Sequence, residues 1–232
     1  MAHKSNSVRL CHLDKSGLQH MDIWQHLEQQ ITRITGNSFH IHNNQSVGGG
    51  CINPAFKVTG NGQSYFIKTN NASYAYMFEA EAEALREMAA SKTVRVPEPV
   101  CYGEYSDQCY VVMEHLELGG SADMRGFASQ LAGMHRVTAD RFGWHIDNTI
   151  GATPQSNTRS DDWIEFWREQ RLGFQLETAA RNGYGGELQR LGERLMADMP
   201  ALFVNHDPQP SMLHGDLWGG NYGALRDGTP VI

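Results

Sequence analysis

The chain has 232 residues, 40% hydrophobic and 9% aromatic, which is typical of a globular protein long enough to bury a core in one large domain or two small lobes. Its formal net charge of −7 argues against a nucleic-acid partner, because nucleic-acid-binding proteins usually carry a basic surface. Four scattered cysteines and eleven histidines lack the spacing of a disulfide framework or a zinc site. No apolar run reaches the roughly 18 residues that span a membrane, and no apolar signal-peptide core is present, so we expect a cytoplasmic protein without a membrane partner.

The first half predicts a helix followed by an antiparallel sheet. An apolar stripe at three- and four-residue steps predicts a helix over residues 21–35. Asn61-Gly62 between two β-like runs is a strong hairpin signal. A second helix is predicted over residues 73–91, between the third and fourth strands. The five expected strands cover residues 39–47, 55–59, 64–69, 100–105 and 109–114.

A composition change at Gly119-Gly120 separates this sheet from a mainly helical part. We therefore place a lobe boundary here, with an N-terminal lobe that includes the leading helix at residues 1–118 and a C-terminal lobe at residues 119–232. Helical stripes in the second lobe comprise three sets: Met124, Phe127, Leu131 and Met134; Trp163, Phe166, Trp167 and Gln170; and Leu188, Leu191, Leu195 and Met199.

The last residues predict a β-hairpin, with strands at residues 222–225 and 230–232 around an Arg-Asp-Gly-Thr turn. The second strand has barely begun at Ile232. We therefore expect the chain to be truncated at its C-terminus.

The sharpest motif is His214-Gly-Asp-Leu-Trp-Gly-Gly-Asn221. Phosphoryl transfer needs a carboxylate that accepts the proton of the attacking hydroxyl and a nearby oxygen ligand for Mg²⁺, and kinases supply both from one loop as an Asp and an Asn five residues later. Asp216 and Asn221 keep that spacing and precede a predicted hairpin, as in kinases. The alternative is a glycine-rich turn with a capping Asp. The spacing favours Asp216 as the catalytic base and Asn221 as a metal ligand.

A second pair points to a nucleotide. Lys68 shares a strand face with Phe66, so its ammonium needs a charged partner. On the following helix Glu81 falls within the apolar stripe, whereas Glu79 and Glu83 fall outside it. A Lys–Glu pair of this kind positions ATP phosphates in kinases.

Two further segments complete the expected ATP site. Gly48, Gly49 and Gly50 join the first two strands, where backbone N–H groups without side chains can approach a phosphate, although a plain turn is the alternative. Cys51 beside them is either a redox-reactive thiol or a small packing residue. Residues 113–116 (Met113, Glu114, His115 and Leu116) end the fifth strand, and we expect their backbone to meet the adenine as the hinge between the lobes, or else to be core strand and linker.

Taken together, these motifs resemble the fructosamine kinase (ketosamine-3-kinase) family, within the aminoglycoside-phosphotransferase-like, protein-kinase-like fold. The resemblance covers nearly everything after residue 21, and the Leu-Trp-Gly-Gly insert and the segment around Pro154-Gln155 are its most particular parts. It implies an α+β, two-lobed kinase-like fold with a five-stranded antiparallel N-lobe sheet. It also implies ATP- and Mg²⁺-dependent phosphorylation of the 3-hydroxyl of a fructosamine or ribulosamine, on a free amine or a glycated lysine, as a deglycation or protein-repair reaction.

By the same resemblance Asp216 is the base, Asn221 a magnesium ligand, and Lys68, oriented by Glu81, the contact to the α/β-phosphates. Trp218 and Asn157 are expected to line the substrate site. The family carries an Asp-Pro-Ala segment just after the final hairpin, whose Asp is the second metal ligand. Since residues 1–232 stop before it, we expect this chain to have little or no kinase activity.

Three other functions stay open. A kinase of the same fold acting on an aminoglycoside, choline or homoserine would share the lobes and the base. A catalytically dead nucleotide-binding fragment would share only the ATP site. A histidine-based metalloenzyme is a distant third, because the histidine spacings make no ligand set.

Overall fold

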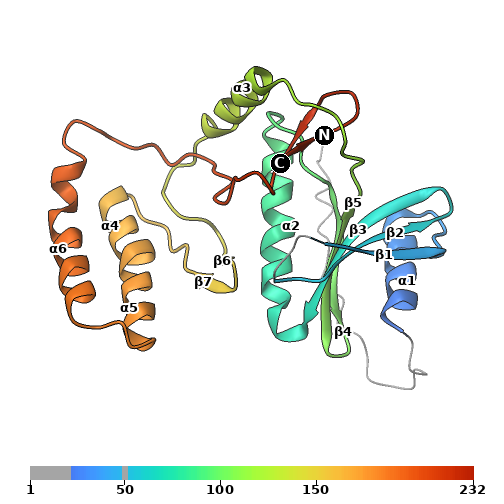
Figure 1. The fold of residues 1–232 in the computed structure, drawn as a ribbon, viewed down its shortest axis with the longest axis horizontal. Coiled ribbons are helices and arrows are strands. Elements are labelled where there is room, and N and C mark those ends of the chain that lie inside the picture. Colours follow the sequence, from blue (N-terminus) through green and yellow to red (C-terminus); the bar gives the residue numbers. More distant parts are fainter. Residues whose placement is uncertain (1–21, 49–51) are drawn as a thin grey trace, which may run out of the picture. The chain divides into compact units, whose positions relative to one another are not determined.

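The computed structural model describes residues 22–48 and 52–232 (Figure 1). The described residues divide into two compact units: one runs to Gln130 and also includes Asp216–Ile232, and the other is Leu131–Gly215. The first unit therefore contains both the N-terminal sheet and the end of the chain. The lobe boundary predicted near Gly119-Gly120 stays a prediction.

The first unit is organised around the predicted five-stranded antiparallel sheet. Its strands are β1 (Asn43–Val47), β2 (Ala55–Gly60), β3 (Gln63–Asn71), β4 (Pro99–Tyr105) and β5 (Gln108–Glu114). They pair in the order β1-β2-β3-β5-β4, antiparallel throughout. The β2–β3 turn is the expected Asn-Gly pair, with positive φ at both Asn61 (50°) and Gly62 (77°), as a tight hairpin turn requires.

Two helices lie on opposite sides of this sheet (Figure 1). α1 (Ile23–Thr35) begins at Asp22, whose side chain accepts from the Trp24 N–H, and ends at left-handed Gly36 (φ 73°). It buries Leu27 and Ile31 in one apolar core with inward-facing residues of β2, β3, β4 and β5. The predicted helix of residues 21–35 is thus confirmed and supports one face of the sheet.

A buried polar contact joins α1 to the sheet. The His26 side chain is 1% exposed, lies within hydrogen-bond distance of the Tyr110 hydroxyl (3.0 Å from Nε2) and stacks on the Tyr105 ring (4.4 Å between centroids). Burial lowers the pKa of His26 below its usual value, and the nearby Arg33 charge acts in the same direction. The imidazole is therefore held in its neutral form.

α2 (Ala75–Ala90) follows a short 3₁₀ turn (Ala72–Tyr74) and packs on β4 and β5 from the other side. It buries Phe78, Ala82 and Leu85, which recur at three- and four-residue steps. The predicted second helix is confirmed. Its inward side faces the strand that carries Lys68.

The last residues of the chain fold onto the first unit as the predicted hairpin, β8 (Gly223–Ala224) and β9 (Pro230–Val231). The N–H groups of Gly119 and Gly120 both donate to the Ala224 carbonyl oxygen, at 3.0 and 3.2 Å. On the other strand, the Ile232 N–H donates to the Arg95 carbonyl oxygen at 3.1 Å. The hairpin is therefore bound at both strands to segments that flank β4 and β5.

Helices dominate the second unit, which also has a small hairpin of β6 (Asn148–Ile150) and β7 (Thr153–Gln155). Its helices are the end of α3 (Met124–His135), α4 (Trp163–Trp167), α5 (Phe174–Arg181) and α6 (Glu187–Leu202). A π-helical turn, Arg168–Gly173, joins α4 to α5. α5 and α6 approach closely, because a Cβ at Gly192 would overlap the Leu176 side chain.

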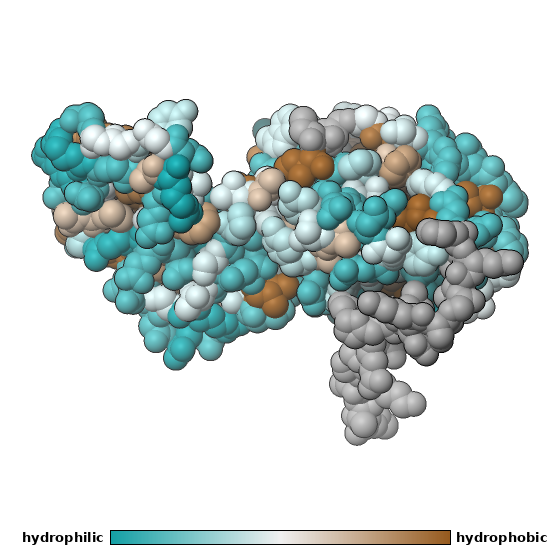
Figure 2. All heavy atoms as spheres, turned by 90° about the horizontal axis from the view of Figure 1, so that it is seen from below, coloured by the Kyte–Doolittle hydropathy of each residue, from teal (hydrophilic) through white to brown (hydrophobic). Residues whose placement is uncertain are grey.

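The predicted stripe of α6 is buried only in part. Met199 is 2% exposed, whereas Leu188, Leu191 and Leu195 are each more than two-fifths exposed. On the face seen in Figure 2, hydrophobic residues form small separate groups among hydrophilic ones. In the described part of the chain, no helix is both long and apolar enough to cross a membrane.

Candidate active site

The His214–Asn221 motif forms an exposed turn whose two key side chains meet. The Asn221 side-chain NH₂ donates to the Asp216 carboxylate (Oδ2, 3.0 Å) and to the Asp216 carbonyl oxygen (2.8 Å). The Asn221 backbone N–H donates to the Trp218 carbonyl oxygen at 2.8 Å. The spacing of five residues thus closes a loop that holds a carboxylate next to an amide.

Trp218 lies over this loop. Its side chain is 61% exposed, and a Cβ added to Gly220 would come within 2.5 Å of the indole ring. Glycine at position 220 therefore lets the outer edge of the indole approach the backbone closely. The contact of Trp218 with a substrate stays a prediction.

The predicted Lys68–Glu81 pair is present in the same compact unit. The Lys68 ammonium donates to Glu81 Oε1 at 2.5 Å, joining β3 to α2. The two side chains are 30% and 27% exposed, so the pair is partly shielded and still open to a ligand. Because strand and helix each fix one partner, the ammonium is oriented by the fold rather than by a flexible loop.

Gly48, the only described residue of the predicted glycine cluster, is exposed and has open space where a side chain would be. Gly49, Gly50 and Cys51 lie outside the described residues. The two strands that the cluster joins are paired up to Val47 and Ala55. The role of these glycines in phosphate binding stays a prediction.

The predicted hinge begins inside the sheet. Met113 is 3% exposed, and Glu114 forms an ion pair with Arg95. The Glu114 N–H donates to the Glu98 carbonyl oxygen at 2.8 Å. The Glu114 side chain also accepts from the Glu98 N–H at 3.2 Å, so Glu114 fixes the segment before β4 through both its backbone and its side chain.

His115 and Leu116 follow outside β5. The His115 ring lies 3.3 Å (Nδ1) from the Ser64 hydroxyl oxygen. Burial lowers the pKa of His115, the Lys57 charge adds to this effect and the Glu117 charge opposes it. The adenine contact predicted for residues 113–116 stays a prediction.

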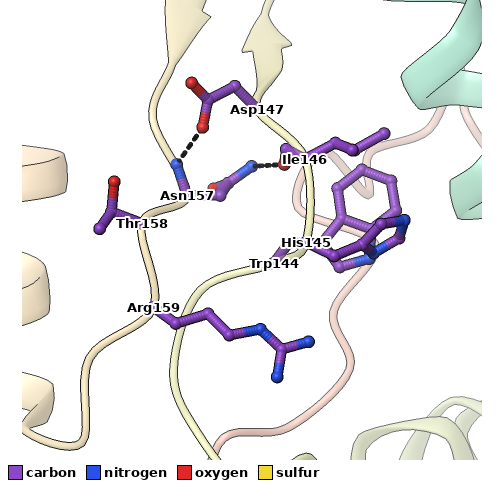
Figure 3. A pocket seen from close by; sticks show the side chains of 7 residues that line it. All are labelled: Trp144, His145, Ile146, Asp147, Asn157, Thr158 and Arg159. Atoms are coloured by element: carbon purple, nitrogen blue, oxygen red, sulfur yellow. Dashed lines mark hydrogen bonds between the residues drawn. The ribbon is translucent and has the colours of Figure 1, made fainter.

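The second unit contains a shallow pocket of about 560 Å³ (Figure 3). Its lining comprises Trp144, His145, Ile146, Asp147, Asn157, Thr158 and Arg159.

Asn157, a predicted substrate contact, forms the buried floor of this pocket, with 3% of its surface exposed. Its N–H donates to Asp147 Oδ1 at 2.8 Å, and its side-chain NH₂ donates to the Ile146 carbonyl oxygen at 3.0 Å (Figure 3). Its side-chain oxygen accepts from Arg171 at 2.7 Å. Asn157 is thus engaged on every side, and its contact with a substrate stays a prediction.

The carboxylate and amide of the loop suit a magnesium ion. Mg²⁺ prefers hard oxygen ligands and usually keeps several waters, so one or two protein ligands suffice. Because the Asn221 NH₂ is committed to Asp216, its amide oxygen is the atom left to ligate. The described residues contain no cluster of three or more His, Cys, Asp or Glu side chains arranged for a metal.

Sequence reasoning missed the contacts that support these residues. The ion pair of Arg95 with Glu114 links residues 19 apart, and the ring of Phe127 on α3 stacks on Tyr222, 5.4 Å between centroids. Half-buried Arg171 holds Asn157 and packs on the Phe166 ring. None of these pairs follows a local spacing. The only sequence signal was the polar residue in an otherwise apolar stripe, which applies to Arg95 between Val94 and Val96.

Comparison with known proteins agrees with this geometry. The chain is 42% identical over 212 residues to a candidate ketoamine kinase of Synechocystis, covering 90% of this chain and 71% of that protein. It is 44% identical over 192 residues to the chloroplastic protein-ribulosamine 3-kinase of Arabidopsis thaliana, of which it spans 59%.

Among solved structures, a candidate fructosamine-3-kinase of Haemophilus somnus matches 91% of this chain and 73% of that one, at 25% identity and a TM-score of 0.81. A spectinomycin phosphotransferase, APH(9)-Ia, matches 92% of this chain and 68% of that one at 16% identity and a TM-score of 0.50, a likeness that concerns the fold alone. The α+β kinase-like fold is thus confirmed. The family model for fructosamine kinase matches residues 23–232, which include the ion pair, the loop and the final hairpin, and the chain therefore belongs to the fructosamine kinase family.

Proposed function

We propose that the protein is an ATP- and Mg²⁺-dependent kinase that phosphorylates the 3-hydroxyl of a ketosamine, carried by a free amine or by a glycated lysine. The names of its relatives, ketoamine kinase and protein-ribulosamine 3-kinase, support this class of substrate. The observation that carries the proposal is the Asn221 amide on the Asp216 carboxylate, in the same compact unit as the Lys68–Glu81 pair.

Asp216 accepts the proton of the substrate hydroxyl as the new oxygen–phosphorus bond forms and the bond to the leaving ADP breaks. Its carboxylate is exposed, as contact with an incoming substrate requires. The Asn221 NH₂ bonded to the same carboxylate fixes its orientation. Bound Mg²⁺ neutralises charge on the phosphates, and Asn221 would be one of its ligands.

Lys68 holds the α/β-phosphates of ATP, and Glu81 keeps its ammonium in place. N–H groups of Gly48, Gly49 and Gly50 cover the phosphates, and the backbone of residues 113–116 receives the adenine. These roles follow from the family and from the position of each segment on the sheet.

Trp218 contributes an aromatic wall to the sugar, because its indole is exposed and it belongs to the same loop as Asp216. Asn157 acts by positioning: its backbone N–H binds the Asp147 carboxylate, its side-chain NH₂ binds the Ile146 carbonyl oxygen, and Arg171 holds its side-chain oxygen.

The test measures ATP-dependent phosphorylation of a ribulosamine and a fructosamine, with the position of the phosphate determined. Asp216→Asn should lower kcat by about 10²–10⁴-fold, the usual contribution of a general base. Asp227→Asn is the matched control, because Asp227 is an exposed aspartate in the turn of the hairpin that follows the loop, and this substitution should leave kcat unchanged.

If an aminoglycoside, choline or homoserine is phosphorylated and ketosamines are not, the proposed substrate class is wrong and the protein is another kinase of the same fold. Nucleotide binding without any product would favour a catalytically dead module. The same assay on residues 1–232 tests the separate prediction of little or no turnover by this chain alone.

A further inference from the structure

The metal-ligating end of the loop is attached to a helix by two aromatic rings. Tyr222 directly follows Asn221, and its ring stacks on Phe127 of α3 at 5.4 Å and 16° between planes. Phe127 is 6% exposed and therefore fixed by packing, whereas Tyr222 is 40% exposed. The stack holds the residue next to Asn221 against a rigid partner.

The chain beyond Tyr222 is fixed as well. Gly119 and Gly120 bind the Ala224 carbonyl oxygen, and a Cβ at Gly120 would overlap the carbonyl oxygen of Leu225. Backbone therefore meets backbone directly at this point. Tyr222 lies between this anchored strand and the loop.

The loop is exposed and is held in part by its own hydrogen bonds. The side chains of residues 215–220 are all exposed, so their burial does not fix the backbone there. Asn221 donates to Asp216 from its side chain and to the Trp218 carbonyl oxygen from its backbone N–H. The chain leaves the loop at Tyr222, so the position of the Asn221 amide also depends on where Tyr222 is held.

We infer that Tyr222, stacked on Phe127, is a positioning residue that sets the Asn221 amide for metal binding. This rests on the proposed function, in which Asn221 ligates Mg²⁺. Residues that orient a metal ligand typically change metal affinity about 10- to 100-fold when removed.

The experiment measures binding of ATP to the full 232-residue chain as Mg²⁺ is raised, by calorimetry, with no turnover required. Tyr222→Ala should raise the Mg²⁺ concentration needed for half-maximal tightening of ATP binding by about tenfold or more. Binding of ATP without Mg²⁺ should stay as in the unchanged chain, because the Lys68–Glu81 pair is untouched. Tyr222→Phe keeps the stack and should restore the original Mg²⁺ dependence.

Tyr184→Ala is the matched control, since Tyr184 is 66% exposed and lies in the other compact unit. It should not change the Mg²⁺ dependence. Thermal unfolding without ligands separates folding from positioning, and Tyr222→Leu, which keeps an apolar side chain without a flat ring, replaces Tyr222→Ala if the latter fails to fold.

An unchanged Mg²⁺ dependence in Tyr222→Ala, or in its replacement, would overturn the inference and leave the proposed function standing. Equal loss of ATP binding with and without Mg²⁺ would also overturn it, because the effect would then be general unfolding. Failure of the unchanged chain to bind ATP at any Mg²⁺ concentration would instead reject the proposed function, and the inference with it.

Discussion

The two halves of the candidate site in the first compact unit are built in different ways. Lys68 and Glu81 project from a strand and a helix, each with buried neighbours, and meet directly in an ion pair. Asp216 and Asn221 lie on an exposed turn, held by hydrogen bonds within the loop and by contacts at its end. The ion pair depends on the sheet as a whole, whereas the loop depends on a few local contacts that a single substitution can remove.

The largest effect is expected at the loop's backbone anchor. Gly120→Ala places a Cβ on the Leu225 carbonyl oxygen, and backbone atoms cannot move aside as a flexible side chain can. We expect the free energy of unfolding to fall by about 3 kcal/mol, as in severe overpacking. Denaturant unfolding measures this free energy. Gly48→Ala is the control, because the space around Gly48 is open. Gly62→Ala is unsuitable as a control because the positive φ of Gly62 would itself cause strain. A loss equal to that of Gly48→Ala would show that the hairpin is not anchored there.

A substitution in the Lys68–Glu81 pair should change the affinity for ATP more than the free energy of unfolding. Glu81→Gln removes the charge that orients Lys68, and we expect ATP to bind about tenfold more weakly, which corresponds to about 1.4 kcal/mol. Stability should change by less than about 1 kcal/mol, because the pair is partly exposed.

Glu83→Gln is the matched control, since Glu83 lies on the same helix and pairs with Arg86. Equal weakening by both substitutions would mean that Glu81 has no special part in the site.

Gly220→Ala tests how loosely the Trp218 side chain is held against the loop. The new Cβ comes within 2.5 Å of the outer atoms of the Trp218 indole, which can swing away because it is largely exposed. The free energy of unfolding should change by no more than about 0.5 kcal/mol, as for other surface substitutions. Tryptophan fluorescence should nevertheless shift as the indole leaves the backbone. An unchanged spectrum would contradict the close contact.

Mild acid should weaken the packing of α1 on the sheet that carries Lys68, without any substitution. The pKa of His26 is lowered in the folded state, so the unfolded chain binds a proton more readily, and this part of the stability is present above pH 6.5 and is lost as the pH falls below it. Amide exchange of α1 should therefore increase between pH 7 and pH 5, after correction for intrinsic rates. His26→Phe should reduce this dependence, whereas His42→Gln, at an exposed position, should not. Equal acid sensitivity in His26→Phe would assign the effect to another group.

The helices and strands could be predicted from the sequence better than the long-range contacts that hold the site residues in place. Periodicity found α1, α2 and the strands β2 to β5, which bury apolar residues, and it placed Glu81 inward where Lys68 meets it. The first strand, β1, is exposed along its length and begins at Asn43 rather than at the predicted residue 39. Motif spacing brought Asp216 and Asn221 together. The stack of Phe127 on Tyr222 lay beyond prediction, since it joins residues 95 positions apart and neither ring breaks a local pattern.

Burial in the second unit was also predicted only in part. The stripe of α6 has the correct period, yet burial depends on what packs against it, and three of its leucines remain exposed. Asn157 was predicted to contact the substrate because it lies in a motif. The motif does not show that Arg171, 14 residues later in the sequence, donates a hydrogen bond to its side chain. Long-range partners of polar groups are the part of the site that periodicity cannot supply.

The π-helical turn between α4 and α5 has a consequence for how this segment tolerates changes of length. A π turn holds one residue more than an α turn, and each residue of an α-helix rotates the next by about 100°. The π turn therefore absorbs its extra residue without this rotation, and deleting a single residue within Arg168–Gly173 would make the helix regular while Leu176 still faced Gly192. Related chains should accept a gap of one residue here more readily than within α5 itself.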